Sequence, residues 1–304
     1  CKLTILMKFI FYFLIIFMGT ISWKIAFPIL ILTVFLAGCT LPTGKGGSKV
    51  SGLGVVVREF KVDPSSIEAI NNQNVYLSLT LQNNGENEAS NLQAIIFGLP
   101  NEFAVSNLDL QPKTLKPASP ERGIPEGETS FGQAVITYNG GDKSTSLTYN
   151  FVVRVNYAYS TVVEGSIKAV TTQYFRQTND RGGLQMVKYT SGPLKVDVVV
   201  PSSVIGQGSS VRVYLYISNV GGGRTYTDNI DNKLDFVKIV PLSGVNSCPV
   251  NEIRIPLGSS ALVSCDLGSI DTQQGFTTKT FRIKIDYNYY FDIPSAITVL
   301  PTLK

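Results

Sequence analysis

The body of the chain repeats itself, and this repeat limits the possible folds more than any other feature. FKVDPSSIEAINNQNVYLSLTLQNNG at 60–85 is matched by VDVVVPSSVIGQGSSVRVYLYISNVG at 196–221, and FVVRVNYAYSTVVEGSIKAV at 151–170 by FRIKIDYNYYFDIPSAITVL at 281–300. The matches are co-linear, and their offset drifts only from 137 residues (64 to 201) to 130 residues (151 to 281). We therefore interpret the body as two copies of one domain of about 110 residues.

Each copy carries the pattern of β-strands. Apolar residues alternate with mostly polar ones at Val75, Leu77, Leu79 and Leu81 in the first copy and at Val211, Val213, Leu215 and Ile217 in the second. A period of two places one set of side chains on each face of a strand. No helical period is visible after residue 54. Many short strands in a domain of this size predict an all-β fold of two tandem immunoglobulin-like β-sandwiches, after an N-terminal hydrophobic helical leader.

The stretch from Val75 to Gly85 follows the pattern V-x-L-x-L-x-x-x-N-x-G, and the stretch from Val211 to Gly221 repeats it with Val213 in place of the first Leu. This pattern resembles the CARDB-type modules, which are Ig-like domains of bacterial and archaeal surface proteins related to cell adhesion or S-layers. The resemblance implies a spacer or adhesive role in an ectodomain and does not imply a reaction.

The N-terminal part of the chain has the pattern of a targeting segment. Lys24 precedes an apolar run from Ile25 to Leu36, which ends in Leu-Ala-Gly-Cys at 36–39. A positive flank, an apolar run and small residues before a cleavage point define a secretory signal. The last four residues resemble the lipobox of prokaryotic lipoproteins, which implies cleavage before Cys39 and a lipid on its thiol. The alternative is an uncleaved membrane helix that ends in an incidental Cys.

These observations predict five segments. A hydrophobic leader covers residues 1–38, within which Met18 is a plausible start because a second apolar run lies upstream of it. A lipidated Cys and a flexible tether rich in Gly and Ser follow at 39–53. The first sandwich is expected at 54–170, a linker at 171–192 and the second sandwich at 193–304. The linker is polar and long, and it either acts as a hinge or packs along the junction between the two sandwiches.

Composition excludes several classes of function. The chain has no His, and only two of its four Cys lie in the body. Such a body lacks the residues of a His-assisted nucleophile or a His/Cys zinc site. The net charge of +4 comes from scattered Lys and Arg, whereas nucleic-acid binding would call for a clustered basic face. We therefore expect no catalytic residue, no cofactor and no nucleic-acid partner.

Two groups of residues are candidate sites. Cys248 and Cys265 are expected to form a disulfide, because two lone Cys outside the membrane most simply pair; two buried free thiols are the alternative. The segment at 225–235 collects hard oxygen ligands of the kind that calcium binds, namely Asp228, Asp231, Asn232 and Asp235. It lacks the Gly and the terminal Glu of an EF-hand loop, so a solvated loop between strands is the favoured interpretation.

Tyrosines cluster late in each copy. Alternation places Tyr157, Tyr159, Tyr287 and Tyr289 on the inward face with the aliphatic residues and points Tyr290 outward. One outward ring does not make an aromatic platform for a sugar, so we interpret the tyrosines as core residues.

The sequence thus predicts a non-catalytic, membrane-anchored protein on the extracytoplasmic face of the cell membrane, held by its N-terminal lipid or helix. It would present two Ig-like domains to an unidentified surface protein or glycan. The alternatives are an accessory subunit of an envelope or membrane complex and a carbohydrate-binding module.

Overall fold

The computed structural model describes residues 54–123, 125–269 and 275–302. The predicted leader, the tether and Cys39 lie outside these residues. In the described part of the chain, no helix is long and apolar enough to cross a membrane. Residues 50–304 form one compact unit, which we call the body.

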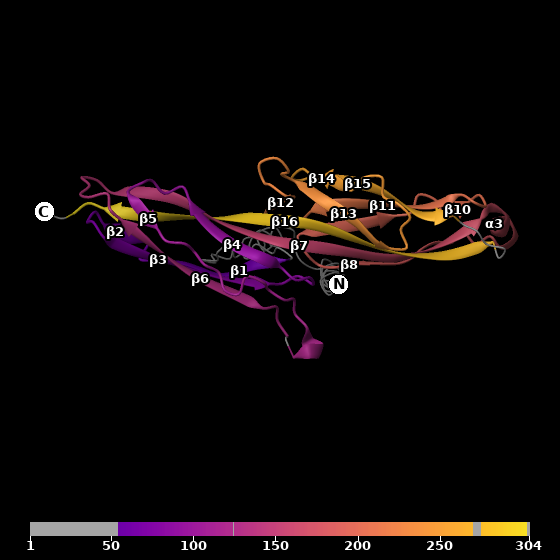
Figure 1. Cartoon of the computed structure of the whole chain (residues 1–304), viewed down its shortest axis with the longest axis horizontal. Coiled ribbons are helices and arrows are strands. Elements are labelled where there is room, and N and C mark those ends of the chain that lie inside the picture. The colour runs from indigo at the N-terminus through magenta and orange to yellow at the C-terminus, as the bar shows by residue number, and fades with distance from the viewer. Residues whose placement is uncertain (1–53, 124, 270–274, 303–304) are drawn as a thin grey trace, which may run out of the picture. The chain divides into compact units, whose positions relative to one another are not determined.

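The body is almost entirely β-structure, as predicted (Figure 1). Its elements are β1 (Val55–Asp63), β2 (Ser66–Glu68), β3 (Gln73–Asn83), β4 (Ser90–Phe97), β5 (Phe103–Val105), η1 (Pro120–Arg122), β6 (Thr129–Tyr138), β7 (Leu147–Thr171), α3 (Thr172–Thr178), β8 (Gly183–Tyr189), β9 (Leu194–Val199), β10 (Val204–Ile205), β11 (Ser210–Asn219), β12 (Arg224–Tyr226), β13 (Phe236–Ser243), β14 (Glu252–Arg254), β15 (Ser260–Ser269) and β16 (Phe276–Leu300).

The alternating positions are the core positions. Val75, Leu77, Leu79 and Leu81 on β3 are all 0% exposed, and so are their counterparts Val211, Val213, Leu215 and Ile217 on β11. Burial of a Val, Leu or Ile side chain contributes about 1.5–3 kcal/mol. The period of two therefore identified correctly the faces of these two strands that hold the core together.

The strands form three sheets that make two sandwiches. One small sheet has the order β1-β3-β6-β5 and the other the order β15-β11-β9. The large sheet contains β7 and β16 at its centre, with β4 and β2 beside them in the first half and β8, β10, β12 and β13 in the second half. We call the half that contains β1–β6 lobe 1 and the half that contains β8–β15 lobe 2.

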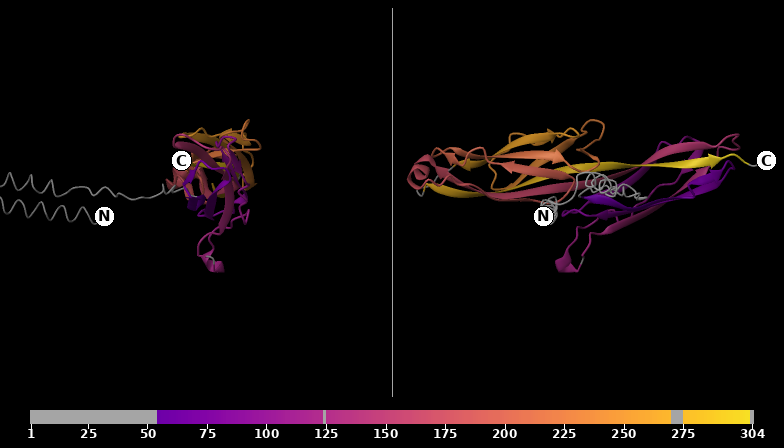
Figure 2. Two further views of the ribbon diagram at one scale, coloured as in Figure 1. Left: turned by 90° about the vertical axis from the view of Figure 1, so that its left-hand side faces the viewer. Right: turned by 180° about the vertical axis from the view of Figure 1, so that it is seen from behind.

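The two lobes share their central strands. β7 and β16 are each 25 residues long, and they pair in one antiparallel register from Phe276↔Val170 to Val299↔Leu147. At ~3.3 Å per residue each strand extends for ~80 Å, and Figures 1 and 2 show the pair running side by side from α3 to the C-terminal end. The first half of β7 and the last half of β16 complete lobe 1, and the other halves complete lobe 2. Each lobe therefore contains a strand from the sequence of the other copy.

The repeat is visible in equivalent hydrogen bonds. The Oδ1 atom of Asn83 accepts from the Gly85 N–H at 3.0 Å, and its Nδ2 donates to the carbonyl of Asn87 at 2.7 Å. Asn219 makes the same two bonds, from Gly221 at 3.1 Å and to the carbonyl of Gly223 at 2.8 Å. The Asn-x-Gly found in both copies is thus the same side-chain-closed turn at the end of β3 and of β11.

The predicted linker at 171–192 contains regular structure. α3 begins after Thr171, whose side chain accepts from the Tyr174 N–H, and ends at Asn179 in the left-handed conformation. β8 then pairs antiparallel with β7, from Val163↔Tyr189 to Lys168↔Gly183. The expectation that no helix follows residue 54 was wrong here, because two turns of helix are too short to produce a visible period.

Candidate functional site

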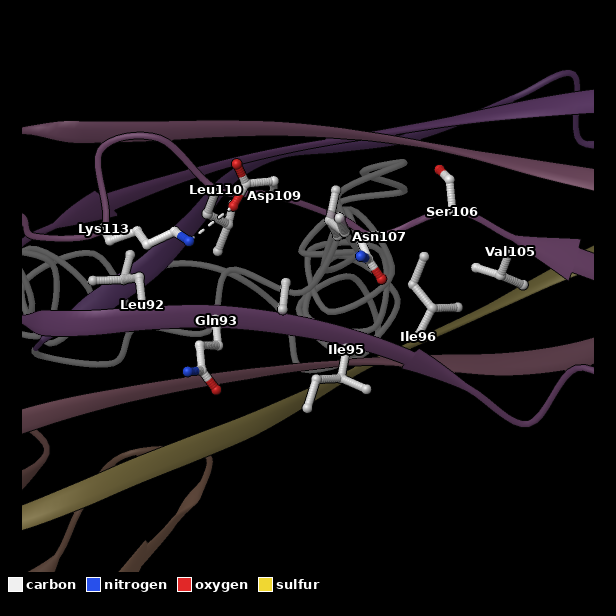
Figure 3. Close-up of a pocket in the computed structure, with 12 residues that line it drawn as sticks. Leu92, Gln93, Ile95, Ile96, Val105, Ser106, Asn107, Asp109, Leu110 and Lys113 are labelled. Atoms are coloured by element: carbon white, nitrogen blue, oxygen red, sulfur yellow. Dashed lines mark ion pairs between the residues drawn. The ribbon is translucent and has the colours of Figure 1, made fainter.

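The clearest concave site lies in lobe 1, between β4 and the segment 105–113 that follows β5 (Figure 3). Its volume is about 580 Å³. The residues that line it, which together we call the groove, are Leu92, Gln93, Ala94, Ile95, Ile96, Val105, Ser106, Asn107, Leu108, Asp109, Leu110 and Lys113.

Both walls of the groove are held by backbone hydrogen bonds. The N–H of Ser106 donates to the carbonyl of Val135 at 2.9 Å, and Gln111 and Phe131 exchange two bonds of 2.9 Å. At the closed end, the Leu92 N–H donates to the carbonyl of Lys113 at 2.9 Å. Because the walls belong to extended segments tied into opposite sheets, the groove is a preformed feature of the sandwich edge.

The groove has an apolar centre and polar ends. Leu108 and Leu110 are 5% and 1% exposed, whereas Ile95 is 50% exposed at the rim. At one end Lys113 lies 3.1 Å from a carboxylate oxygen of Asp109. The pKa of Asp109 is lowered, first by the hydrogen bond from Gln111 and then by Lys113. Apolar contact with a few fixed polar groups is typical of a binding site.

Sequence reasoning missed this groove. The signal available was the run Ala94-Ile95-Ile96-Phe97, which is apolar on both faces of its strand. A strand with one solvated face normally alternates between apolar and polar residues. The loss of alternation in β4 marks the place where outward positions are also apolar, and the side chains of Ile95 and Phe97 are 50% and 41% exposed there.

The inward tyrosines are buried, as predicted. Tyr157, Tyr159, Tyr287 and Tyr289 are between 2% and 4% exposed, and they lie where the two lobes meet. The Tyr159 hydroxyl accepts from the Asn87 N–H at 3.1 Å and donates to the carbonyl of Ser191 at 3.1 Å. Burial raises the pKa of Tyr159, and likewise that of Tyr289, to about 12. These four rings form a structural cluster, which we call the tyrosine cluster.

The outward orientation predicted for Tyr290 did not leave its ring free, because the residue is only 9% exposed. The guanidinium of Arg154 covers the ring at 4.3 Å from its centroid and also lies 5.1 Å from the Phe97 centroid. Arg154 is held by two bonds to Asp292, of 2.7 and 2.8 Å. A neighbouring strand thus covers the face that alternation alone assigned to solvent.

The disulfide prediction is confirmed. Cys248 and Cys265 are bonded, and Cys265 on β15 is completely buried. The bond ties the loop after β13 to the small sheet of lobe 2.

The carboxylates of the predicted acidic loop interact with cations of the chain. Asp235 is 2% exposed, and Arg224 binds both of its oxygens at 2.9 and 2.7 Å. Asp228 lies 2.6 Å from the ammonium of Lys238. Among the described residues, no group of three or more Asp, Glu, Cys or His is arranged to hold a metal ion. The arrangement is that of a loop braced by ion pairs.

The register explains where this loop comes from. Ser90 pairs with Ala158 and Gln93 with Asn156, whereas the equivalent partners Asn288 and Asp286 pair with Tyr226 and Lys238. Two residues separate Ser90 from Gln93, and eleven separate Tyr226 from Lys238. The acidic loop is therefore an insertion in the second copy.

No protein-family model and no curated protein matches this chain. Among solved structures, the chain is similar to the Yersinia pseudotuberculosis adhesin InvE, with 9% sequence identity and a TM-score of 0.20. The match covers 85% of this chain and 62% of that one, so this chain spans less than two thirds of that protein's length. A TM-score of this size carries no argument about function.

Proposed function

We propose that this protein is a non-catalytic, membrane-anchored extracytoplasmic protein that presents a rigid pair of Ig-like lobes for adhesion or support at the cell surface. The observation that carries the proposal is the continuous pairing of β7 with β16 through both lobes. A ladder of this length resists bending between the lobes, because any hinge would have to break its hydrogen bonds. Such a body suits a protein that holds a surface in place.

The extracytoplasmic location is supported by two independent features. The bond between Cys248 and Cys265 is of a kind that persists in oxidising compartments. Leu36-Ala37-Gly38-Cys39 matches a lipobox at the end of an apolar run. With the lipid on Cys39, residues 40–53 would connect the body to the outer face of the membrane. The CARDB-type pattern in both copies agrees with this role.

Adhesion through the groove is the most specific form of this proposal. The groove offers an apolar centre, a half-exposed rim residue in Ile95 and a charged end at Asp109 and Lys113. An extended peptide of a surface protein has the shape and chemistry for such a slot, since its side chains would fill the apolar centre and its polar backbone would meet the rim.

The test compares the groove with a matched surface. Ile95→Asp places a charge at the rim, and Leu262→Asp places the same charge on β15 in lobe 2; the two side chains are 50% and 49% exposed. We expect Ile95→Asp to reduce adhesion of cells or coated beads at least tenfold and Leu262→Asp to leave it unchanged. An equal effect of both variants, or of neither, would reject the groove as the adhesive site.

Anchoring is tested separately. Cys39→Ser removes the thiol that would carry the lipid, and the expected result is release of the protein from the membrane fraction with its fold intact. Retention of Cys39→Ser in membranes would favour the uncleaved helix.

An accessory subunit of an envelope complex is the second candidate, and the shared strands favour it equally, because rigid lobes also suit docking. Mild crosslinking followed by purification separates the two. A stoichiometric partner in the membrane would identify a subunit, and its absence would leave the adhesive role. A glycan array tests the carbohydrate-binding alternative.

A further inference from the structure

The outer edge of β16 in lobe 1 is open among the residues that the structure describes. β12 covers β16 up to Tyr290, and β2 covers it again from Thr298. Residues 291–297, which we call the open edge, pair only with β7. The Thr298 N–H donates outward to the carbonyl of Ser65 at 3.0 Å. Since N–H and C=O groups alternate in direction along a strand, Asp292 and Ala296 also direct theirs outward.

The equivalent edge in lobe 2 is filled. β16 residues follow β7 residues by 130 positions in the repeat, so the open edge corresponds to 161–167 of β7. That edge pairs with β8, and the Thr190 N–H donates to the carbonyl of Val162 at 2.9 Å. The chain therefore covers one of two equivalent edges with a strand that immediately precedes β9.

Burial differs between the two edges in the way a missing strand would produce. Thr161 and Val163, beneath β8, are both 0% exposed. Their counterparts Phe291 and Ile293 are only half-buried, although both are larger apolar residues. Leaving such side chains partly in water forgoes about 25 cal/mol per Å² of apolar surface.

The segment that precedes β1 resembles β8 in sequence and in spacing. Val55 pairs with Asn83 as Leu194 pairs with Asn219, so Val55 and Leu194 are equivalent. Lys49, Val50 and Ser51 stand six, five and four residues before Val55, as Lys188, Tyr189 and Thr190 stand before Leu194. A Cβ on Gly54 would lie 2.9 Å from Pro193, so the chain enters lobe 1 beside the point where it enters lobe 2.

We propose that residues 49–51 form an additional strand on the open edge of β16, in the register that β8 adopts on β7. Val50 then faces Ile293, as Tyr189 faces Val163. Ser51 faces Asp292, and its hydroxyl takes the place of the Thr190 Oγ1, which accepts from the Val162 N–H at 2.9 Å. Lys49 faces Pro294, which stands where β7 has Glu164.

Pro294 limits the length of this strand. Proline has no N–H, so the edge loses one ladder donor at this position and the pairing ends there. The same residue prevents the open edge from acting as a template for a foreign strand. A short intramolecular strand is therefore a better occupant than a second copy of the chain, because its effective concentration is high and it needs few bonds.

The inference adds to the proposed function and does not depend on it, since it holds with or without a lipid on Cys39. It shortens the free part of the tether to residues 40–48. The random-coil reach of nine residues is about 17 Å, so the body would stay close to its anchor.

The register is tested by disulfide trapping in the full-length chain. Val50→Cys with Ile293→Cys should form a bond on mild oxidation, because facing residues in a non-hydrogen-bonded pair lie within disulfide reach. Val163→Cys with Tyr189→Cys, on the filled edge, is the positive control, and Val50→Cys with Ser295→Cys is the off-register control. Peptide mapping by mass spectrometry identifies each bond. Trapping of the positive control alone, or equal trapping of the off-register pair, would overturn the proposal.

Amide hydrogen exchange gives a second readout in the same chain. Lys49→Pro should speed exchange of a peptide that spans 291–297 at least tenfold, whereas Lys45→Pro, the matched control outside the strand, should not. Unchanged exchange in Lys49→Pro, with the Cys248–Cys265 bond intact as a check on folding, would contradict an added strand.

Discussion

Tyr159 on β7 and Tyr287 on β16 face each other across the antiparallel ladder, with ring centroids 6.1 Å apart. One residue further, Ala158 pairs with Asn288. These two positions are also 130 residues apart, which is the offset of the repeat, so the ladder has a pseudo-two-fold axis there. The two copies therefore meet as the subunits of a symmetric dimer would, within a single chain.

Removal of a buried hydroxyl in the tyrosine cluster should destabilise the body. Tyr159→Phe leaves the Asn87 N–H and the Ser191 carbonyl without their partner, which costs about 1–3 kcal/mol. Urea unfolding measures the loss. Tyr76→Phe is the matched control, because Tyr76 is 59% exposed, and its free energy of unfolding should not change. Equal losses for both variants would show that the hydroxyl bonds of Tyr159 carry no special weight.

The body should lose stability in alkaline solution. A buried phenol keeps its proton, so the pKa of Tyr159 and of Tyr289 is about 12 in the folded state, against about 10 in the unfolded chain. Because the folded pKa is the higher one, this contribution is fully present below about pH 10 and is lost as the pH rises towards 12.

The measurement is the free energy of unfolding between pH 8 and pH 12, about the range of these pKa values. In Tyr159→Phe with Tyr289→Phe the slope against pH should be shallower than in the unmodified chain. Identical slopes would mean that other groups control alkaline unfolding.

Truncation should show that the lobes depend on each other. A chain that stops after Tyr290 lacks the part of β16 that pairs with β7 between Leu147 and Val155. We expect amides of β4 and of the first half of β7 in lobe 1 to lose their protection, while β11 and β15 in lobe 2 keep theirs. Removal of 301–304 alone, which leaves β16 complete, is the control. Full protection of lobe 1 in the shorter chain would contradict the sharing of strands.

Loss of the disulfide should weaken lobe 2. Cys248 and Cys265 are 17 residues apart, and a bond that closes a loop of this size contributes about 3 kcal/mol. Cys248→Ala with Cys265→Ala should lower the unfolding midpoint by this amount, as should reduction of the unmodified protein. A reducing agent should have no effect on the double variant, and an effect there would mean that another bond is involved.

Local pattern was enough to predict a large part of the structure. Alternation identified the buried faces of β3 and β11 and the inward tyrosines, because the side-chain direction in a strand depends only on position along that strand. The repeat predicted two similar halves, and the equivalent turns at Asn83 and Asn219 bear this out. The pairing of Cys248 with Cys265 followed from simple elimination.

Other features depended on contacts between residues far apart in the chain. Tyr290 was expected to face solvent, yet Arg154, 136 positions earlier, covers its ring. The groove needed the meeting of β4 with the segment after β5, which no periodicity encodes.

The alternating residues by themselves determined that this chain forms strands, which faces are buried and that the body consists of two similar halves. Only the tertiary structure decided that the halves exchange strands, so that β16 begins in lobe 2 and ends in lobe 1. The reason is physical. A side chain's inward or outward direction is a local property of its own strand, whereas the choice of neighbouring strand is made by hydrogen bonds and packing between distant segments, and many pairings satisfy the same local pattern.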